Sequence, residues 1–265
     1  MKQKSQRFII MSKIFEGVLL CSDIDGTMYY NGFVPSNLEA LQYFMNEGGL
    51  FTFCTGRRAI YAPKEVTPNA PIVGMCGAEV CDASSGTILE RWAFGEEWRE
   101  IAAALHTRTD LAFVQFESEK AHRIPAHDPA VTDFIATFDG PVYKMIFLYK
   151  ELRQDPELVP PEVRSWCQGR CAVMSNGNDE FEMTAAGRDK ANGVRYLKKY
   201  TGADLLVCAG DYDGDMSMLR EADIGYAVDN AAPCVKAAAD RVTVHARDGA
   251  IAHIIRELEA ELRNR

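Results

Sequence analysis

Both ends of the chain alternate short apolar runs with amphipathic stretches. Residues 18–22 form a continuous apolar run, which is typical of a strand buried on both faces. An amphipathic segment follows, with Ser36 in the position of a helix N-cap, and the glycine pair 48–49 ends it. Two more apolar runs, at residues 50–54 and 71–75, predict two further strands.

The C-terminal part repeats this alternation. The pattern predicts strands over residues 205–209, 224–228 and 242–244, and helices over 190–200, 216–221, 231–239 and from the cap residue Asp248 to the C-terminus. Alternating strands and helices are typical of proteins with a parallel sheet covered on both faces. We therefore expect an α/β fold with a doubly wound, mostly parallel, Rossmann-like core sheet.

The middle of the chain lacks this regular order. The pattern predicts strands over residues 91–94, 142–149, 170–175 and 179–184, a helix over 96–107, and loops around 122–127 and over the proline-rich residues 155–161. Such a mixture favours an α+β unit. We expect an inserted α+β domain over residues 82–184, and a core domain formed by residues 1–81 and 185–265.

Composition and charge restrict the class of partner. Of the 265 residues, 47% are hydrophobic, which suits a globular protein with a core. The formal net charge is −9, whereas proteins that bind nucleic acid or anionic membranes carry clustered Lys and Arg. No stretch approaches the ~20 consecutive apolar residues of a membrane-spanning helix. We expect neither a nucleic-acid nor a membrane partner, whereas a small phosphorylated metabolite needs only a few local cations.

The eight cysteines form no Cys-x-x-Cys pair and no zinc-type cluster with histidine. Three of them, Cys21, Cys54 and Cys208, lie inside apolar runs, so we interpret the cysteines as reduced core residues of a cytoplasmic protein. Charges interrupt the apolar N-terminal segment, which therefore fits a secretion signal poorly. Met1 and Met11 both stay open as the start residue, and the sequence does not indicate the oligomeric state.

Two acids follow the first predicted strand, in the run Asp23-Ile24-Asp25-Gly26-Thr27. An ordinary polar turn is one explanation. However, two carboxylates at the end of a buried strand repel each other and are partly desolvated. A divalent cation would relieve both costs, and carboxylate oxygens suit magnesium. A carboxylate can also attack phosphorus and form an aspartyl-phosphate.

Three further segments lie at strand ends or at a helix start. Thr55 and Gly56 follow the second strand, where a hydroxyl and free N–H groups suit a phosphate. Lys190 begins a predicted helix; it is either a surface lysine or the cation that neutralises a phosphoryl group. The run Gly210-Asp211-Tyr212-Asp213-Gly214-Asp215 follows another core strand and lacks the twelve-residue pattern of a calcium loop.

Taken in order, these four segments resemble the motifs of the haloacid dehalogenase superfamily. The chain is most similar to its Cof-type sugar-phosphatase branch, which carries a large α/β cap domain between the second and third motifs, where the insert of this chain lies. The resemblance covers nearly the whole sequence. It implies a magnesium-dependent hydrolase of small phosphomonoesters, such as a sugar phosphate, that works through an aspartyl-phosphate.

The resemblance also implies a role for each motif residue. Asp23 would be the nucleophile and Asp25 the general acid and base. Thr55, Gly56 and Lys190 would bind the phosphoryl group. The Mg²⁺ ion would be held by Asp23, by the backbone carbonyl of Asp25, and by Asp211 and Asp215.

The sequence departs from the pattern of this branch at a few positions. Gly214 and Cys76 stand where Asn is usual, Asp189 stands where a small polar residue is commoner, and Asp213 adds a charge beside Gly214. In the insert, Glu182 is open to two interpretations, a substrate contact or a structural salt bridge. Two other functions also stay open: a phosphomutase or phosphotransferase of the same superfamily, and a non-catalytic sensor of a phosphorylated ligand.

Overall fold

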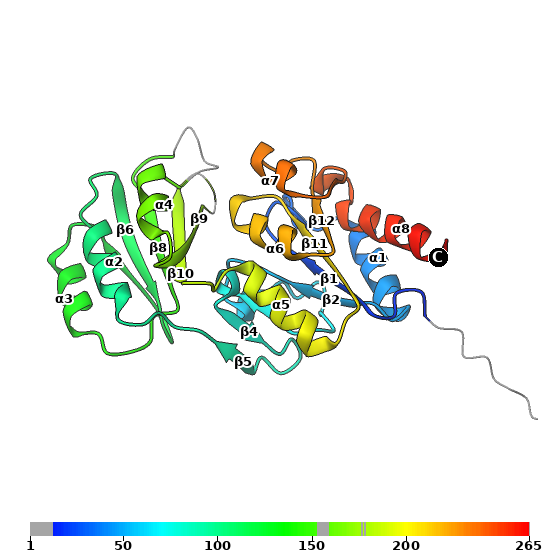
Figure 1. Ribbon diagram of the computed structural model, residues 1–265, viewed down its shortest axis with the longest axis horizontal. Helices are drawn as coiled ribbons and strands as arrows, with labels where there is room; N and C mark the ends of the chain where they lie inside the picture. The colour runs from blue at the N-terminus through cyan, green and yellow to red at the C-terminus, as the bar shows by residue number, and fades with distance from the viewer. Residues whose placement is uncertain (1–12, 153–158, 176, 178, 265) are drawn as a thin grey trace, which may run out of the picture.

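The computed structural model describes residues 13–152, 159–175, 177 and 179–264. They form two lobes that lie side by side (Figure 1). One lobe, here the core lobe, holds the first and last described residues and contains a five-stranded parallel sheet in the order β13-β12-β11-β1-β2. Its strands are β1 (Val18–Ser22), β2 (Leu50–Phe53), β11 (Leu205–Gly210), β12 (Ile224–Ala227) and β13 (Arg241–Val242).

Helices cover both faces of this parallel sheet. Along β1 every residue is buried, and alternate side chains enter two different hydrophobic clusters. Val18 and Leu20 pack with α1 (Pro35–Asn46) and α8 (Ala250–Arg263). Leu19 and Cys21 pack on the opposite face, which is covered by α5 (Lys190–Thr201), α6 (Met216–Glu221) and α7 (Pro233–Ala238). The predicted doubly wound α/β sheet is therefore confirmed.

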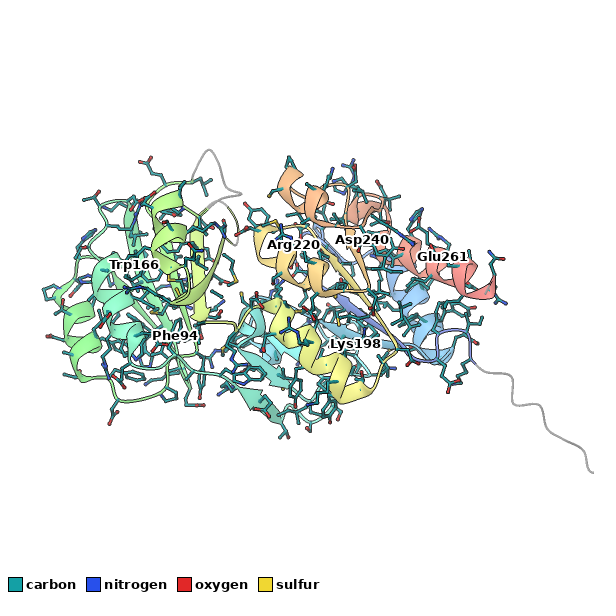
Figure 2. All side chains as sticks on the ribbon, viewed as in Figure 1. Phe94, Trp166, Lys198, Arg220, Asp240 and Glu261 are labelled. Atoms are coloured by element: carbon teal, nitrogen blue, oxygen red, sulfur yellow. The ribbon has the colours of Figure 1, made fainter. Side chains whose placement is uncertain are left out.

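The second lobe consists of an antiparallel sheet with helices on one face. Its strand order is β7-β6-β8-β10-β9. The strands are β6 (Leu111–Glu117), β7 (Ala121–Pro125), β8 (Lys144–Tyr149), β9 (Cys171–Ser175) and β10 (Glu180–Ala185), and the helices are α2 (Glu97–Leu105), α3 (Pro129–Thr137) and α4 (Pro161–Cys167). Phe94 and Trp166 lie in this lobe, whereas Lys198, Arg220, Asp240 and Glu261 lie in the core lobe (Figure 2).

A small antiparallel sheet lies where the chain leaves the core lobe. It contains β3 (Ile72–Gly74), β4 (Glu79–Cys81) and β5 (Ile88–Arg91). A parallel bridge between Cys54 and Val73 attaches this sheet to the end of β2. Strand β5 falls within residues 82–184, the predicted insert, yet it pairs with β4, which precedes that insert. The chain enters the second lobe after β5 and returns between β10 and α5.

Several details of the sequence-based prediction are wrong. The strand predicted over residues 91–94 is β5 and ends at Arg91. The stretch predicted as a loop around 122–127 contains the edge strand β7, where Pro125 is tolerated because an edge needs fewer backbone donors. Ser36 and Asp248 are not caps: α1 begins after Val34, with Pro35 in its first turn, and α8 begins after Gly249.

Two other predictions concern the loop over 155–161 and the start residue. Residues 153–158, Met1 and Met11 lie outside the described residues, and α4 begins at Pro161. All eight cysteines are free thiols; seven of them are buried, as expected for core residues, and Cys234 is partly buried. In the described part of the chain, no helix combines the length and apolar character needed to cross a membrane.

Candidate active site

The four sequence motifs meet at one edge of the parallel sheet. Strands β11, β1 and β2 are parallel neighbours, so the residues that follow them lie side by side at their carboxyl ends. A cavity of about 210 Å³ lies at this edge, between the two lobes. Its lining includes every residue predicted for the site: Asp23, Asp25, Thr55, Gly56, Lys190, Asp211 and Asp215.

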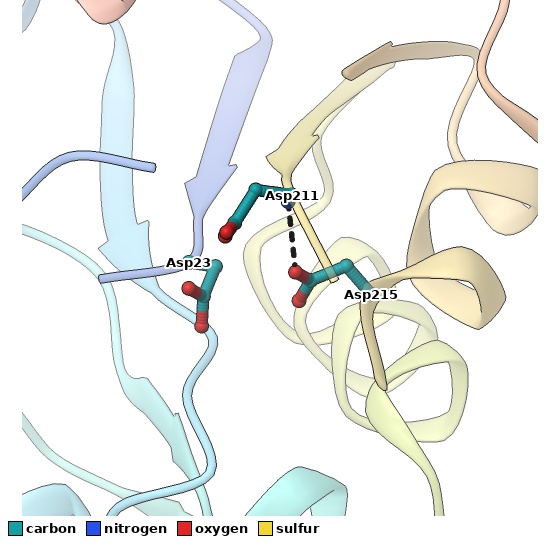
Figure 3. Close-up of side chains that lie close together, drawn as sticks. All are labelled: Asp23, Asp211 and Asp215. Carbon is teal, nitrogen blue, oxygen red and sulfur yellow. Dashed lines mark hydrogen bonds between the residues drawn. The ribbon is translucent and has the colours of Figure 1, made fainter. Parts of the chain in front are cut away.

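Three carboxylates converge in this cavity (Figure 3). One oxygen each of Asp23, Asp211 and Asp215 lies within 4.8 Å of the others, and these residues are 7%, 9% and 1% exposed. The Thr27 hydroxyl donates to Asp211 Oδ1 at 2.7 Å. Asp215 Oδ2 accepts from the backbone N–H groups of Asp211 and Tyr212, each at 3.0 Å. These bonds fix two of the three acids on the loop after β11.

Lys190 is the cation of this cluster. Lys190 is the first residue of α5. The preceding residue, Asp189, is the N-cap of this helix, and its side chain accepts a hydrogen bond from the backbone N–H of Asn192. Lys190 Nζ donates to Asp23 Oδ1 at 2.7 Å and to Asp215 Oδ1 at 2.5 Å. Burial acts to lower the pKa of Lys190, but the charges of Asp215 and Asp23 outweigh it and raise this pKa well above its ordinary value. Lys190 is therefore charged at neutral pH.

One lysine does not neutralise three acids. Burial raises the pKa of Asp23 to about 7, against the attraction of Lys190 and with the help of the Asp215 charge. Burial, together with the charges of Asp23 and Asp215, also raises the pKa of Asp211 well above its ordinary value. The cluster therefore has more acidic groups than its single lysine can neutralise. The atoms that could coordinate a metal ion here are carboxylate oxygens, which are hard ligands. The residues present therefore fit a divalent cation such as Mg²⁺.

The Asp25 side chain lies outside the acidic cluster. Its carboxylate accepts from Arg57 Nε at 2.8 Å and from Arg57 Nη2 at 2.5 Å. Both side chains are about half exposed, at 51% and 43%. Arg57 thus holds the Asp25 carboxylate outside the group of three acids. A metal contact by Asp25 would therefore come from its backbone carbonyl, as the resemblance implies.

Thr55 and Gly56 line the same cavity as the acidic cluster. Thr55 is 1% exposed, and its hydroxyl accepts from the backbone N–H of Arg57 at 3.2 Å. The carbonyl of Gly56 accepts from Lys144 of the second lobe at 2.9 Å. The turn after β2 therefore presents polar groups to the cavity on one side and is tied to β8 on the other.

A glycine is required beside the acidic cluster. Gly26 has a φ of +88°, a conformation that L side chains rarely adopt. A Cβ atom at this position would lie 2.1 Å from Asp211 Oδ2. The Asp-Gly pair in the first motif therefore lets the chain turn while a carboxylate from another strand comes into contact with it.

The second lobe contributes cavity residues that the sequence motifs do not include. Glu182 on β10 accepts from Cys76 Sγ at 2.7 Å and from Lys144 Nζ at 2.5 Å, and all three residues are nearly fully buried. Glu182 thus forms a structural salt bridge and also lines the cavity. Met174 and Ser175 of β9 line it too. No local pattern distinguishes these residues, because the register of the antiparallel sheet brings them there.

The sequence is similar to known proteins. The sequence profile of the haloacid dehalogenase-like hydrolases matches residues 20–255. The chain is 28% identical over 173 residues to the Escherichia coli (strain K12) 5-amino-6-(5-phospho-D-ribitylamino)uracil phosphatase YbjI, covering 59% of this chain and 63% of YbjI. It is 33% identical over 145 residues to the chloroplastic endoribonuclease YBEY of Arabidopsis thaliana, covering 52% of this chain and 23% of that protein. The matches thus span less than two thirds of either relative.

The fold comparison covers almost the entire chain. The HAD subclass IIB sugar phosphatase BT4131 superposes with a TM-score of 0.72 at 22% identity, over 90% of this chain and 98% of that structure. At this identity the likeness shows a shared fold. Because the family profile matches most of its length, the chain belongs to the haloacid dehalogenase-like hydrolase family. The resemblance predicted from the four motifs is confirmed.

Proposed function

We propose that this protein is a magnesium-dependent phosphatase of small phosphomonoesters, with Asp23 as the nucleophile. The observation that carries the proposal is the buried group of Asp23, Asp211 and Asp215 around Lys190, at the end of a cavity between the lobes. Asp23, Asp211, Asp215 and the backbone carbonyl of Asp25 would hold Mg²⁺. When bound, the ion would shield the negative charges of nucleophile and phosphate from each other.

The residues of the chain divide the reaction between them. An Asp23 carboxylate oxygen would form a bond to phosphorus while the bond from phosphorus to the ester oxygen breaks. Asp25 would donate a proton to the departing alcohol. Asp25 would then take a proton from water, whose oxygen attacks the same phosphorus and releases Asp23 and inorganic phosphate. Thr55, Gly56 and Lys190 would orient the phosphoryl oxygens and neutralise their charge.

A second cavity supports a substrate larger than phosphate. It has a volume of about 560 Å³ and shares Gly56, Arg57 and Glu182 with the smaller cavity. Polar residues of β6, β8 and β10 line it. We propose that residues 82–184 act as a cap whose sheet contacts the leaving group, with a sugar phosphate or a phosphorylated sugar-alcohol derivative as the substrate class. The named activity of YbjI is consistent with this class.

A phosphatase assay tests the proposal directly. An aryl phosphate and a panel of phosphorylated metabolites should release phosphate with Mg²⁺ and not with a chelator. Asp23→Asn should lower kcat by a factor of ~10³ or more, equivalent to at least ~4 kcal/mol of barrier. Transfer to an added sugar in preference to water would instead indicate a phosphotransferase. Tight binding of a phosphorylated metabolite without turnover would indicate a sensor and contradict the proposal.

A further inference from the structure

The two lobes are joined by polar contacts on opposite sides of the smaller cavity. On the side where the chain crosses between the lobes, Lys144 and Glu182 of the second lobe contact Gly56 and Cys76 of the core lobe. On the other side the contact is made by Asp213, the first residue of the short 3-10 turn η3 (Asp213–Asp215), which follows the predicted metal residue Asp211. The residues that make this second contact, Asp213, Arg164 and Ser175, are not part of the segments that cross between the lobes.

Asp213 has its charge buried between the lobes. It is 6% exposed, and its side chain only 2%. Its Oδ2 atom accepts from the backbone N–H of Ser175, the last residue of β9, at 2.9 Å. The same oxygen accepts from Arg164 Nη2 on α4, also at 2.9 Å. Both donors belong to the second lobe. A buried carboxylate costs free energy unless it is paired, so these bonds favour the arrangement in which the lobes touch.

The Asp213 side chain does not belong to the cluster of Asp23, Asp211 and Asp215 that we propose as the metal site. Asp211, Tyr212, Gly214 and Asp215 line the smaller cavity, whereas Asp213 does not. Asp213 instead lines a separate cavity of about 200 Å³ together with Arg164. The additional acid of the fourth motif therefore does not add charge to the metal group, because its charge is balanced by a guanidinium from the other lobe.

The neighbouring glycine is consistent with a close contact at this position. A Cβ atom on Gly214 would have the Met174 side chain of β9 as its nearest neighbour, at 3.8 Å. A longer side chain at 214 would extend into the space between the turn and β9. Position 214 thus has room for a methyl group in ordinary contact with β9, and the bond to the second lobe at this turn comes from the neighbouring Asp213.

We infer that Asp213 is a positioning residue that locks β9 of the second lobe against the metal-binding turn and so completes the wall of the catalytic cavity. This inference rests on the proposed function for the meaning of the cavity, but the contact itself is independent of it. When Asp213 bonds to Ser175 and Arg164, the Met174–Ser175 segment and the turn 211–215 are held at the fixed separation that encloses a substrate. Without this contact, both parts keep their own fold, and the enclosure becomes transient.

Amide hydrogen exchange tests the contact without substrate. In Asp213→Ala the Ser175 N–H loses its acceptor, and we expect its exchange to become at least tenfold faster, while amides of β8 and β11 keep their wild-type rates. The matched control is Arg195→Met, which removes an ion pair between α5 and α6 within the core lobe. It should leave exchange at Ser175 unchanged. Unchanged exchange at Ser175 in Asp213→Ala would overturn the inference.

A second pair of variants covers the case in which Asp213→Ala does not fold. Asp213→Asn keeps a carbonyl oxygen for the Ser175 N–H and loses the charge, and Arg164→Met removes only the guanidinium. Both should raise KM for a metabolite phosphate at least fivefold with a smaller change in kcat, and the double variant should be no worse than either single one. Additive effects would show that the two residues act separately and would contradict the inference. A protein without any phosphatase activity would refute the proposed function, while the exchange result would still decide the contact.

Discussion

Lys190 and Asp23 are 167 residues apart in the sequence and 2.7 Å apart in the structure, Nζ to Oδ1. The lysine also bonds to Asp215, so it joins the nucleophile to the loop after β11. Because Lys190, Asp23 and Asp215 are all buried, their two ion pairs should contribute both to the charge balance of the site and to the stability of the core lobe.

Replacing Lys190 with Met should therefore have two effects. Two buried acids lose their cation, which typically costs about 3–5 kcal/mol of unfolding free energy. The phosphoryl group also loses its cationic partner, so kcat/KM should fall by a factor of ~10² or more. Urea denaturation and steady-state kinetics measure the two effects. Lys190→Arg is the control and should recover stability in part. Wild-type kinetics in Lys190→Met would exclude Lys190 from the phosphate site.

Mg²⁺ should stabilise the folded protein, because it binds the buried acids only when they converge. At a concentration of 100 times Kd the expected gain is about 2.7 kcal/mol. Asp211→Ala should abolish the shift in Tm on addition of Mg²⁺. Asp139→Asn, an exposed position in the second lobe, should keep it. A shift that persists in Asp211→Ala would place the metal elsewhere.

The ion pair between Arg57 and Asp25 should matter for rate and not for stability. Both side chains are about half exposed, and such pairs contribute only about 0–1 kcal/mol. Arg57→Met should leave the denaturation midpoint nearly unchanged. The released Asp25 side chain loses its fixed orientation beside the cavity, so we expect kcat to fall about tenfold, or about 1.4 kcal/mol of barrier. Equal kcat values for Arg57→Met and the wild type would show that Arg57 does not orient Asp25.

Glu180 should make the stability depend on pH. Burial, assisted by the charge of Glu182, raises the pKa of Glu180 to about 7 in the folded protein, compared with an ordinary value of 4.5. The folded state thus holds this proton more tightly than the unfolded state. Its stabilising contribution is complete below pH 4.5, decreases as the pH rises, and is lost above about pH 7, with a total of about 3 kcal/mol.

The variant Glu180→Gln isolates this contribution. Unfolding free energies measured from pH 4 to pH 8 should decrease less steeply for Glu180→Gln than for the wild type. The difference between the two curves should reach its full size near pH 7. Asp133→Asn, on an exposed turn of α3, serves as the control and should reproduce the wild-type curve. Parallel curves for Glu180→Gln and the wild type would contradict the assignment.

The core sheet could be predicted from the sequence because its strands are buried on both faces. Strands such as β1 and β11 therefore appear as continuous apolar runs. The seven site residues could be selected because each follows such a run or begins a helix, and parallel strands bring their ends to one edge. For the same reason the prediction placed these residues at the sheet edge where the cavity lies.

The second lobe was harder to predict because its chemistry depends on register. Lys144 and Glu182 come together only because β8 and β10 pair in antiparallel fashion. Strand β7 has no continuous apolar run, since it lies at the sheet edge with alternating exposed residues. The hydrogen bond between Asp213 and Ser175 joins the two lobes, and no pattern in either sequence segment predicts that these residues come into contact.

The missing side chain at Gly26 restricts how this site can change. Its Cα lies so near to the Asp211 carboxylate that a single methyl group would overlap with it. Even alanine, the smallest alternative, would force two strand ends apart and separate the acids that must converge. The position without a side chain in the first motif is thus as restrictive as the two acids that precede it, and loss of function there would arise from added volume instead of lost chemistry.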